Sequence, residues 1–175
     1  SYVATNAAVL STAQIASLST GQVSGLTSQA VSALSTAELS ALGTNLSLLS
    51  SGAVISISST KLAQLSTALF ASLQSNQLNA LTSGQLTALT TAQLGGLSTD
   101  QVNSFTATQI GKLSGTQFAS LTTAQIHNLN SSDIPALSTA EVSALTTAQV
   151  VAFTDAQIGA LTSSQGIAIK ATQVA

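Results

Sequence analysis

Residues 73–96 have the sequence LQSNQLNA, LTSGQLTA and LTTAQLGG, three consecutive variants of one eight-residue pattern. The pattern is Leu, Ser or Thr, Ser or Thr, a small residue, Gln or Glu, an aliphatic residue, a variable residue and a second small residue. It continues in phase from Leu49 to Ala168, which makes 15 octads, and four more octads run from Leu10 to Ala41. Such a short fixed period is typical of architectures in which successive units stack on one another.

The repeats are arranged along the chain with one change of phase. Residues 42–48 form a seven-residue unit, which shifts the register between residues 10–41 and residues 49–168. Residues 1–9 resemble a degraded first repeat and residues 169–175 a partial one, as is typical of the margins of a repeat array. We expect all of these parts to form one continuous solenoid.

A period of eight residues is incompatible with both regular secondary structures. In a continuous α-helix, eight residues overshoot two turns by roughly 80°, so the apolar stripe would wind around the helix. In a flat strand, octad positions one and six would point to opposite faces. The chain must therefore bend once in every repeat.

The polar residues at positions two and five indicate how each bend is made. Ser or Thr followed three residues later by Gln or Glu is the capping box of a helix N-terminus. Fourteen octads carry Gln or Glu at position five, and Asp133 is a shorter acidic variant in another. Representative predicted cap pairs are Ser11 with Gln14, Ser35 with Glu38, Thr122 with Gln125, and Ser138 with Glu141.

The apolar residues at positions one and six match the hydrophobic staple, which packs the residue before the cap against the fourth helical residue. Representative predicted core pairs are Leu10 with Ile15, Leu89 with Leu94, Leu121 with Ile126, and Phe153 with Ile158. Since single helical turns are unstable alone, these residues must pack between neighbouring coils. The sequence thus predicts an all-α solenoid of capped helices of about one turn, one per octad, with two or three octads per coil.

A β-solenoid is the alternative fold. Thr, Val and Ile favour strands, and short repeats commonly build β-helices. The capping-box spacing and the exchange of Gln with Glu favour helices.

Composition excludes several classes of function. Only 5% of the residues are charged, there are three Lys and no Arg, and the net charge is -2. Such a chain has no basic patch to neutralise phosphates, so we expect no nucleic-acid partner. Polar residues interrupt every apolar run well below the roughly 20 residues of a membrane span, so none is expected.

The few residues that could carry chemistry are explained by the repeat itself. His127 stands alone at position seven, without the further Cys or His that a metal site needs. Asp100 and Asp155 lie where a first helical turn favours negative charge. Glu38 and Glu141 occupy the Gln slot, 103 positions apart. We therefore predict no catalytic, cofactor-binding or metal-binding residue and no cofactor.

Two further sets of residues depart from the repeat without forming a site. The three lysines fall at positions five, eight and two of their octads, so they form no stripe. Pro135 lies at position seven of an octad with Asn130 at the cap and Asp133 three residues later. Because Pro lacks an amide hydrogen, it is tolerated only where the helix ends after about one turn, and we expect an irregular corner there.

The octads LSTAEVSA at 137–144 and LTTAQVVA at 145–152 resemble the Leu-Thr-Thr-Ala-Gln-Ile/Val arrays of very large bacterial secreted and cell-surface proteins, often described as adhesin-like. The resemblance covers nearly the whole chain. It implies export and a role at the surface or in a fibre, and it transfers no catalytic or binding residue.

Two hypotheses for function follow. The first is a non-catalytic structural module, an extracellular stalk, spacer or filament subunit that self-associates into a fibre or stacked assembly; the absence of Cys and the scarcity of Lys and Arg suit an exposed fibre. The second is a binding surface in which regular Ser and Thr pairs, such as Thr90-Thr91, Thr122-Thr123 and Thr146-Thr147, contact ice, a glycan or a polymer.

Overall fold

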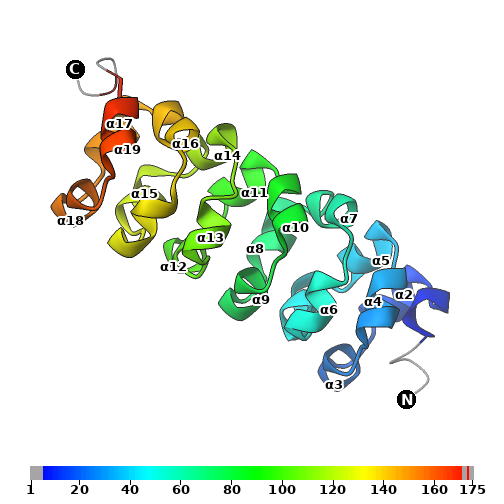
Figure 1. Cartoon of the computed structure of the whole chain (residues 1–175). Helices are drawn as coiled ribbons and strands as arrows, with labels where there is room; N and C mark the ends of the chain where they lie inside the picture. Colours follow the sequence, from blue (N-terminus) through cyan, green and yellow to red (C-terminus); the bar gives the residue numbers. More distant parts are fainter. Residues whose placement is uncertain (1–5, 171–172, 174–175) are drawn as a thin grey trace. The chain divides into compact units, whose positions relative to one another are not determined.

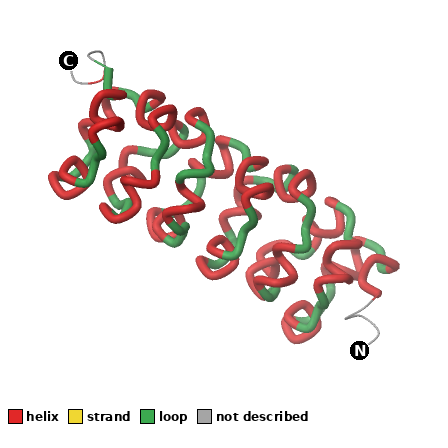
Figure 2. The backbone as a smooth tube through the Cα atoms, viewed as in Figure 1, coloured by secondary structure: helices red, strands yellow, loops and turns green. Residues whose placement is uncertain are grey.

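The computed structural model describes residues 6–170 and residue 173, and the chain divides into two compact units, Ser1–Leu89 and Thr90–Ala175. In each unit, short helices follow one another at intervals of one repeat, and no strand occurs among the described residues (Figure 2). The predicted all-α fold of short helices is therefore confirmed, and the β-solenoid alternative is wrong.

Each unit has its own series of helices (Figure 1). The first unit contains η1 (Ala7–Val9), α2 (Thr12–Ala16), α3 (Thr20–Ser24), α4 (Ser28–Ala33), α5 (Thr36–Ala41), η2 (Gly43–Leu48), α6 (Ser51–Ile55), α7 (Ser59–Ala63), α8 (Thr67–Ala71), α9 (Ser75–Asn79) and α10 (Ser83–Ala88). The second unit contains α11 (Thr91–Gly95), α12 (Thr99–Asn103), α13 (Ala107–Ile110), α14 (Gly115–Ala119), α15 (Thr123–His127), η3 (Ser131–Ala136), α16 (Thr139–Ala144), α17 (Thr147–Val151), α18 (Asp155–Gly159) and α19 (Ser163–Ala168).

Two extended residues make the corner between successive helices, as the passage from α16 to α17 illustrates. Leu145 (φ -60°, ψ 145°) ends α16, and Thr146 (φ -78°, ψ 161°) caps α17. The Thr146 hydroxyl accepts a hydrogen bond from the Gln149 amide, so the next helix starts at once. In most octads the residue at position two thus caps a new helix, so no helix in the described part of the chain grows beyond about one and a half turns.

Three consecutive repeats complete one coil, because each helix packs against the helix three repeats further along. In the first unit α2 packs on α5, α7 on α10, and the series η1, α4, α6, α9 and α3, η2, α8 stack in order. In the second unit the stacks are α11, α14, α16, α19, then α12, α15, α17, and finally α13, η3, α18. Of the two coil sizes that the sequence allowed, each unit therefore has the larger, with three octads per coil.

Besides η1, two repeats form 3-10 helices where the pattern is broken. The seven-residue unit gives η2, in which Gly43 has φ +57°, a conformation that glycine adopts at little cost. In η3 the residue Pro135 lies inside the helix, and Asn130 makes no side-chain cap bond. The Asn130 amide instead donates to Oδ1 of Asn103, at 3.0 Å. Asp133, one methylene shorter than Gln, does not complete a capping box with it.

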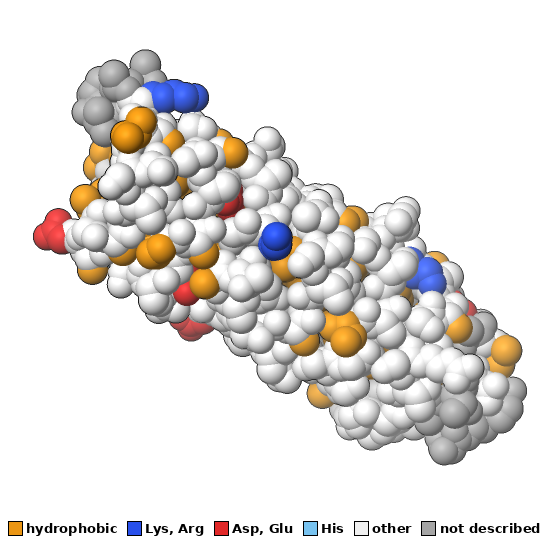
Figure 3. Space-filling view, viewed as in Figure 1, with side chains coloured by type: hydrophobic (Ala, Val, Ile, Leu, Met, Phe, Trp, Pro, Cys, Tyr) orange, Lys and Arg blue, Asp and Glu red, His pale blue; other side chains and the backbone are white. Residues whose placement is uncertain are grey.

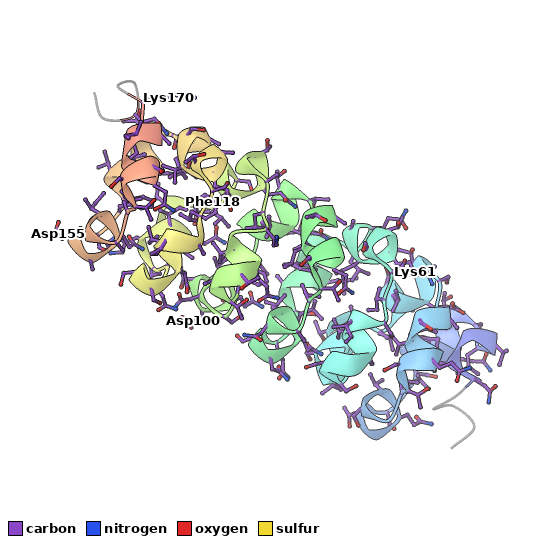
Figure 4. All side chains as sticks on the ribbon, viewed as in Figure 1. Lys61, Asp100, Phe118, Asp155 and Lys170 are labelled. Atoms are coloured by element: carbon purple, nitrogen blue, oxygen red, sulfur yellow. The ribbon has the colours of Figure 1, made fainter. Side chains whose placement is uncertain are left out.

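The core of each unit runs along the inside of the coils. It consists of the apolar residues at positions one and six, which alternate along the chain as the helices turn inward. The largest fully buried side chains include Phe70 in the first unit and Phe118 in the second, where Figure 4 shows Phe118 among the side chains between the helices. The inner coils of each unit therefore bury pairs of large apolar residues from three octads against their neighbours.

Candidate functional site

A hydrogen-bonded node around position five of the octad is the best-defined polar arrangement in the molecule. At the start of α15, the Thr122 amide donates to Oε1 of Gln125 at 2.6 Å, and the Gln125 amide donates to the Thr122 hydroxyl at 3.1 Å. The other end of the same side chain, Nε2, donates to the carbonyls of Leu97 (2.7 Å) and Leu94 (3.0 Å) in the preceding coil. Gln125 is only 2% exposed, so it caps its own helix and joins two coils in a dry environment.

This amide clamp recurs with a constant register in both units. The Nε2 group donates to the carbonyl 28 residues earlier, at 2.6–2.8 Å, and to a second carbonyl 30 or 31 residues earlier. The acceptors are the carbonyls of position one and of the end of the helix before it. The side chains that make these bonds, besides Gln125, are Gln77, Gln85, Gln149, Gln157, Gln165 and Gln173.

Lys61 shows that a residue other than Gln can donate a hydrogen bond from position five to the previous coil. It replaces Gln at the start of α7, and its Nζ donates to the Ser32 carbonyl at 2.8 Å. An ammonium group has donors only. It therefore preserves the bond between coils, while the helix keeps its cap through the Ser58 hydroxyl.

The donor role of Gln was missed from the sequence, where Gln and Glu were treated as equivalent acceptors. The signal was present, because position five holds twelve Gln and only two Glu. If only the acceptor mattered, Glu would be favoured at least equally, since a carboxylate also stabilises the positive end of the helix. The preference for Gln indicates a second bond that a carboxylate cannot make.

The predicted cap residues lie at the starts of their helices. In all four pairs the hydroxyl accepts from the amide of the third helical residue, whose side chain accepts from the cap amide: Ser11 with Gln14, Ser35 with Glu38, Thr122 with Gln125, and Ser138 with Glu141.

Six of the eight predicted core residues are buried, namely Ile15, Leu89, Leu94, Leu121, Ile126 and Phe153. Leu10 is half-buried, and Ile158 is 46% exposed, so neither belongs to the closed core. The reason is their place in the coils: α18 packs on η3, and the described residues include no helix three repeats beyond α18 to cover Ile158. Ile126 is fully buried because α15 lies between α12 and α17.

Glu141 is the exception among the clamps. It is completely buried, and its Oε2 accepts from the Ser138 amide (2.6 Å) and hydroxyl (2.7 Å). Its Oε1 is buried without a hydrogen-bond partner. Burial raises the pKa of the Glu141 carboxyl above the ordinary value of 4.5, and the two bonds from Ser138 only partly oppose this shift.

The remaining chemistry-bearing residues lie apart from one another on the surface. His127 is exposed, and its Nδ1 lies 2.9 Å from the Ala152 carbonyl oxygen. Asp100 and Asp155 are exposed in the first turns of α12 and α18 (Figure 4). The face in Figure 3 is mostly neutral and polar, with single charged side chains scattered over it.

No pocket, and no group of three or more His, Cys, Asp or Glu that could hold a metal ion, is found within residues 6–170 and 173. In the same residues, no helix has the length and apolar character to cross a membrane.

Comparison with known proteins identifies a repeat. A family model described as the ALTTAQ repeat matches residues 83–115 and 126–163. These two stretches are therefore similar to ALTTAQ repeats, and the chain contains a repeat region of that kind. Neither the curated proteins nor the solved structures include a match to this chain.

Proposed function

We propose that this chain is a non-catalytic structural repeat module that acts as a stalk, spacer or filament subunit on the outside of a bacterial cell. The observation that carries the proposal is the amide clamp. Within each unit, glutamines at position five join successive coils through the same bonds, so a structure of this kind can be extended by adding repeats. The caps and the bonds between coils also engage Glu38, Glu141 and Lys61, three of the few residues that could carry chemistry.

Self-association is part of this proposal and is supported by the outermost described coils. The side chains of Gln14 and Gln22 are exposed in the first coil, whereas the glutamines at position five further along, except Gln101, are buried. Ile158 and Ile167 are exposed in the last coil, Ile167 by 85%. A further coil, from a longer chain or from a second copy, would cover these groups with the contacts that already join the coils within each unit.

Small-angle scattering over a range of concentrations, together with electron micrographs of the purified protein, tests the proposal. A stalk or filament subunit is expected to have a radius of gyration well above the roughly 16 Å of an ordinary globular domain of this length. End-to-end association would raise the value further with concentration. A radius of gyration close to that of a globular domain at all concentrations would reject the structural role.

The extracellular location is supported by the resemblance of residues 137–152 to repeats of bacterial secreted proteins and by the absence of Cys. Antibody labelling of intact cells that produce the chain, compared with labelling of permeabilised cells, tests it. Signal that requires permeabilisation would exclude an exposed location.

A binding surface is the second candidate, favoured by one row of threonines. Thr99, Thr123 and Thr147 follow the caps of α12, α15 and α17, which stack in successive coils. The preceding hydroxyls of Ser98, Thr122 and Thr146 are engaged as caps. A measurement of thermal hysteresis, repeated with Thr123→Val, tests ice binding by this row, and no hysteresis in the unmodified chain would remove that ligand.

A further inference from the structure

Glu141 occupies the position that a glutamine clamp fills in the three repeats that follow it, at Gln149, Gln157 and Gln165. Helix α16, which carries it, packs between α14 and α19. The clamps of the neighbouring repeats reach the carbonyls 28 and 31 residues earlier, through the Nε2 donor of Gln157 or Gln165. By the same register, the carbonyls of Leu113 and Ile110 would be the ones opposite the outer side-chain atom of Glu141.

The outer atom of Glu141 is Oε1, which is buried and makes no hydrogen bond. An ionised carboxylate at this place brings an unpaired charge toward backbone carbonyl oxygens, which are acceptors themselves. A buried charge without a partner is strongly unfavourable, and a carboxyl group in such surroundings takes up a proton instead.

We propose that Glu141 makes a proton-dependent hydrogen bond between the coils that contain α14 and α16. When a proton from solvent binds Oε1, the resulting hydroxyl donates to the Leu113 carbonyl and takes the place of the glutamine amide. When that proton leaves to solvent, the bond is lost, and the carboxylate faces the carbonyl as one acceptor against another. The hydrogen bond between the two coils is therefore formed at acidic pH and lost as the pH rises.

Among the described residues, the helices that pack against α16 carry no charged group to compensate Glu141. Helices α14 and α19, which pack against α16, contain no Asp, Glu, Lys, Arg or His, and α16 has only Glu141 itself. Lys112 precedes Leu113 and Lys170 follows α19, but both are exposed. Desolvation by burial is the leading cause of the raised pKa of Glu141, and only the Ser138 bonds oppose it.

The effect of pH on stability follows from this direction. Below about 4.5 the carboxyl is protonated in both the folded and the unfolded chain. Above that pH the unfolded chain releases the proton first, so it binds fewer protons than the folded chain and stability falls with rising pH. The loss is complete once the pH has passed the folded pKa.

The test compares the thermal unfolding of the full chain with that of Glu141→Gln between pH 3.5 and 8.5. The variant supplies a permanent amide donor, so its Tm should be close to the wild-type value at pH 3.5 and higher by about 3 °C or more at pH 8. Glu38→Gln makes the same change in the half-buried capping box of α5 and is the matched control. The pH-dependent loss that is attributed to Glu141 should persist in it.

A direct titration of the Glu141 carboxyl in the wild-type chain tests the proposal independently of the stability of the variants. With 13C-labelled glutamate, the NMR signal of the Glu141 carboxyl should titrate above 4.5, and the signal can be assigned by its absence from Glu141→Gln. A midpoint at or below 4.5, or a Tm difference between the two proteins that is constant over the whole pH range, would overturn the proposal.

Discussion

At the scale of the residue, the glutamine clamps depend on a side chain that accepts and donates at the same time. The amide of Gln125 has an oxygen for the Thr122 amide and two hydrogens for the carbonyls of Leu94 and Leu97. Glutamate provides the first function alone and lysine the second alone. One buried amide therefore satisfies three backbone groups, and few polar atoms between the coils remain without a hydrogen bond.

Gln125→Glu is expected to destabilise the second unit by about 3 kcal/mol at pH 7. The cap is retained, but two buried bonds are lost and a charge is placed against acceptors. Urea denaturation followed by circular dichroism measures the loss, which should shrink at acidic pH as the new carboxyl is protonated. Gln22→Glu is the matched control because Gln22 caps α3 in the same way but is exposed, and its effect should stay within about 0.5 kcal/mol. Equal losses of unfolding free energy in the two variants would show that the bonds from Gln125 to the previous coil do not stabilise the fold.

The cap hydroxyl contributes separately from the clamp. Thr122→Ala removes the acceptor of the Gln125 amide and should cost about 1 kcal/mol. Thr123→Ala changes the next residue, which is exposed and already helical, and should be neutral or slightly stabilising because Ala has the higher helix propensity. The same denaturation experiment compares them. A larger loss for the Thr123 variant would show that the cap assignment is wrong.

At the scale of the element, the start of each helix and its packing have different origins in the sequence. The cap is set by residues three apart, so the spacing of Ser or Thr and Gln is sufficient to predict where α15 begins. The stacking of α15 on α12 depends on residues three octads apart, and nothing within one octad indicates it. For this reason the helical class was predictable and the choice between two and three octads per coil was not.

The glycines show the same division between local and distant causes. Gly111 and Gly159 both stand at position seven, and the sequence gives no reason to treat them differently. At Gly111 an added Cβ would overlap the carbonyl oxygen of Ala136 in the next coil, whereas at Gly159 it would meet nothing within 4 Å. Close approach of coils is therefore a requirement at one position and not at the other.

Substitution of these two glycines by alanine should accordingly have opposite signs. Gly111→Ala is expected to destabilise the second unit by about 2 kcal/mol, because α13 or η3 must shift to relieve the overlap. Gly159→Ala should stabilise it by about 0.5–1 kcal/mol through the lower entropy of the unfolded chain. Thermal unfolding of the two variants beside the wild type decides the matter, and a stabilising Gly111 variant would show that the coils are less closely packed there.

At the scale of the whole molecule, the unit that can be added or removed is a coil and not an arbitrary length of chain. The pattern of residues within an octad indicated modularity, yet the size of the module follows from the clamp register of 28 residues. Ile158 illustrates this, because its octad matches that of Ile126. Ile126 is buried between two neighbouring coils, whereas Ile158 is 46% exposed.

Deletion of residues 121–144 removes one complete coil and should leave a folded protein. Gln149 would then lie 28 residues after Leu97, a position-one residue whose carbonyl is now bound by Gln125. Helicity per residue should be unchanged, and Tm should fall by only a few degrees because one set of interfaces is lost. Deletion of residues 121–132 removes half as many residues but breaks the octad phase, so that Gln109, a position-five residue, takes the place of the position-one acceptor opposite Gln149. This shorter deletion should lose helicity and cooperative unfolding in circular dichroism, and a shorter deletion tolerated better than the longer one would refute the coil as the structural module.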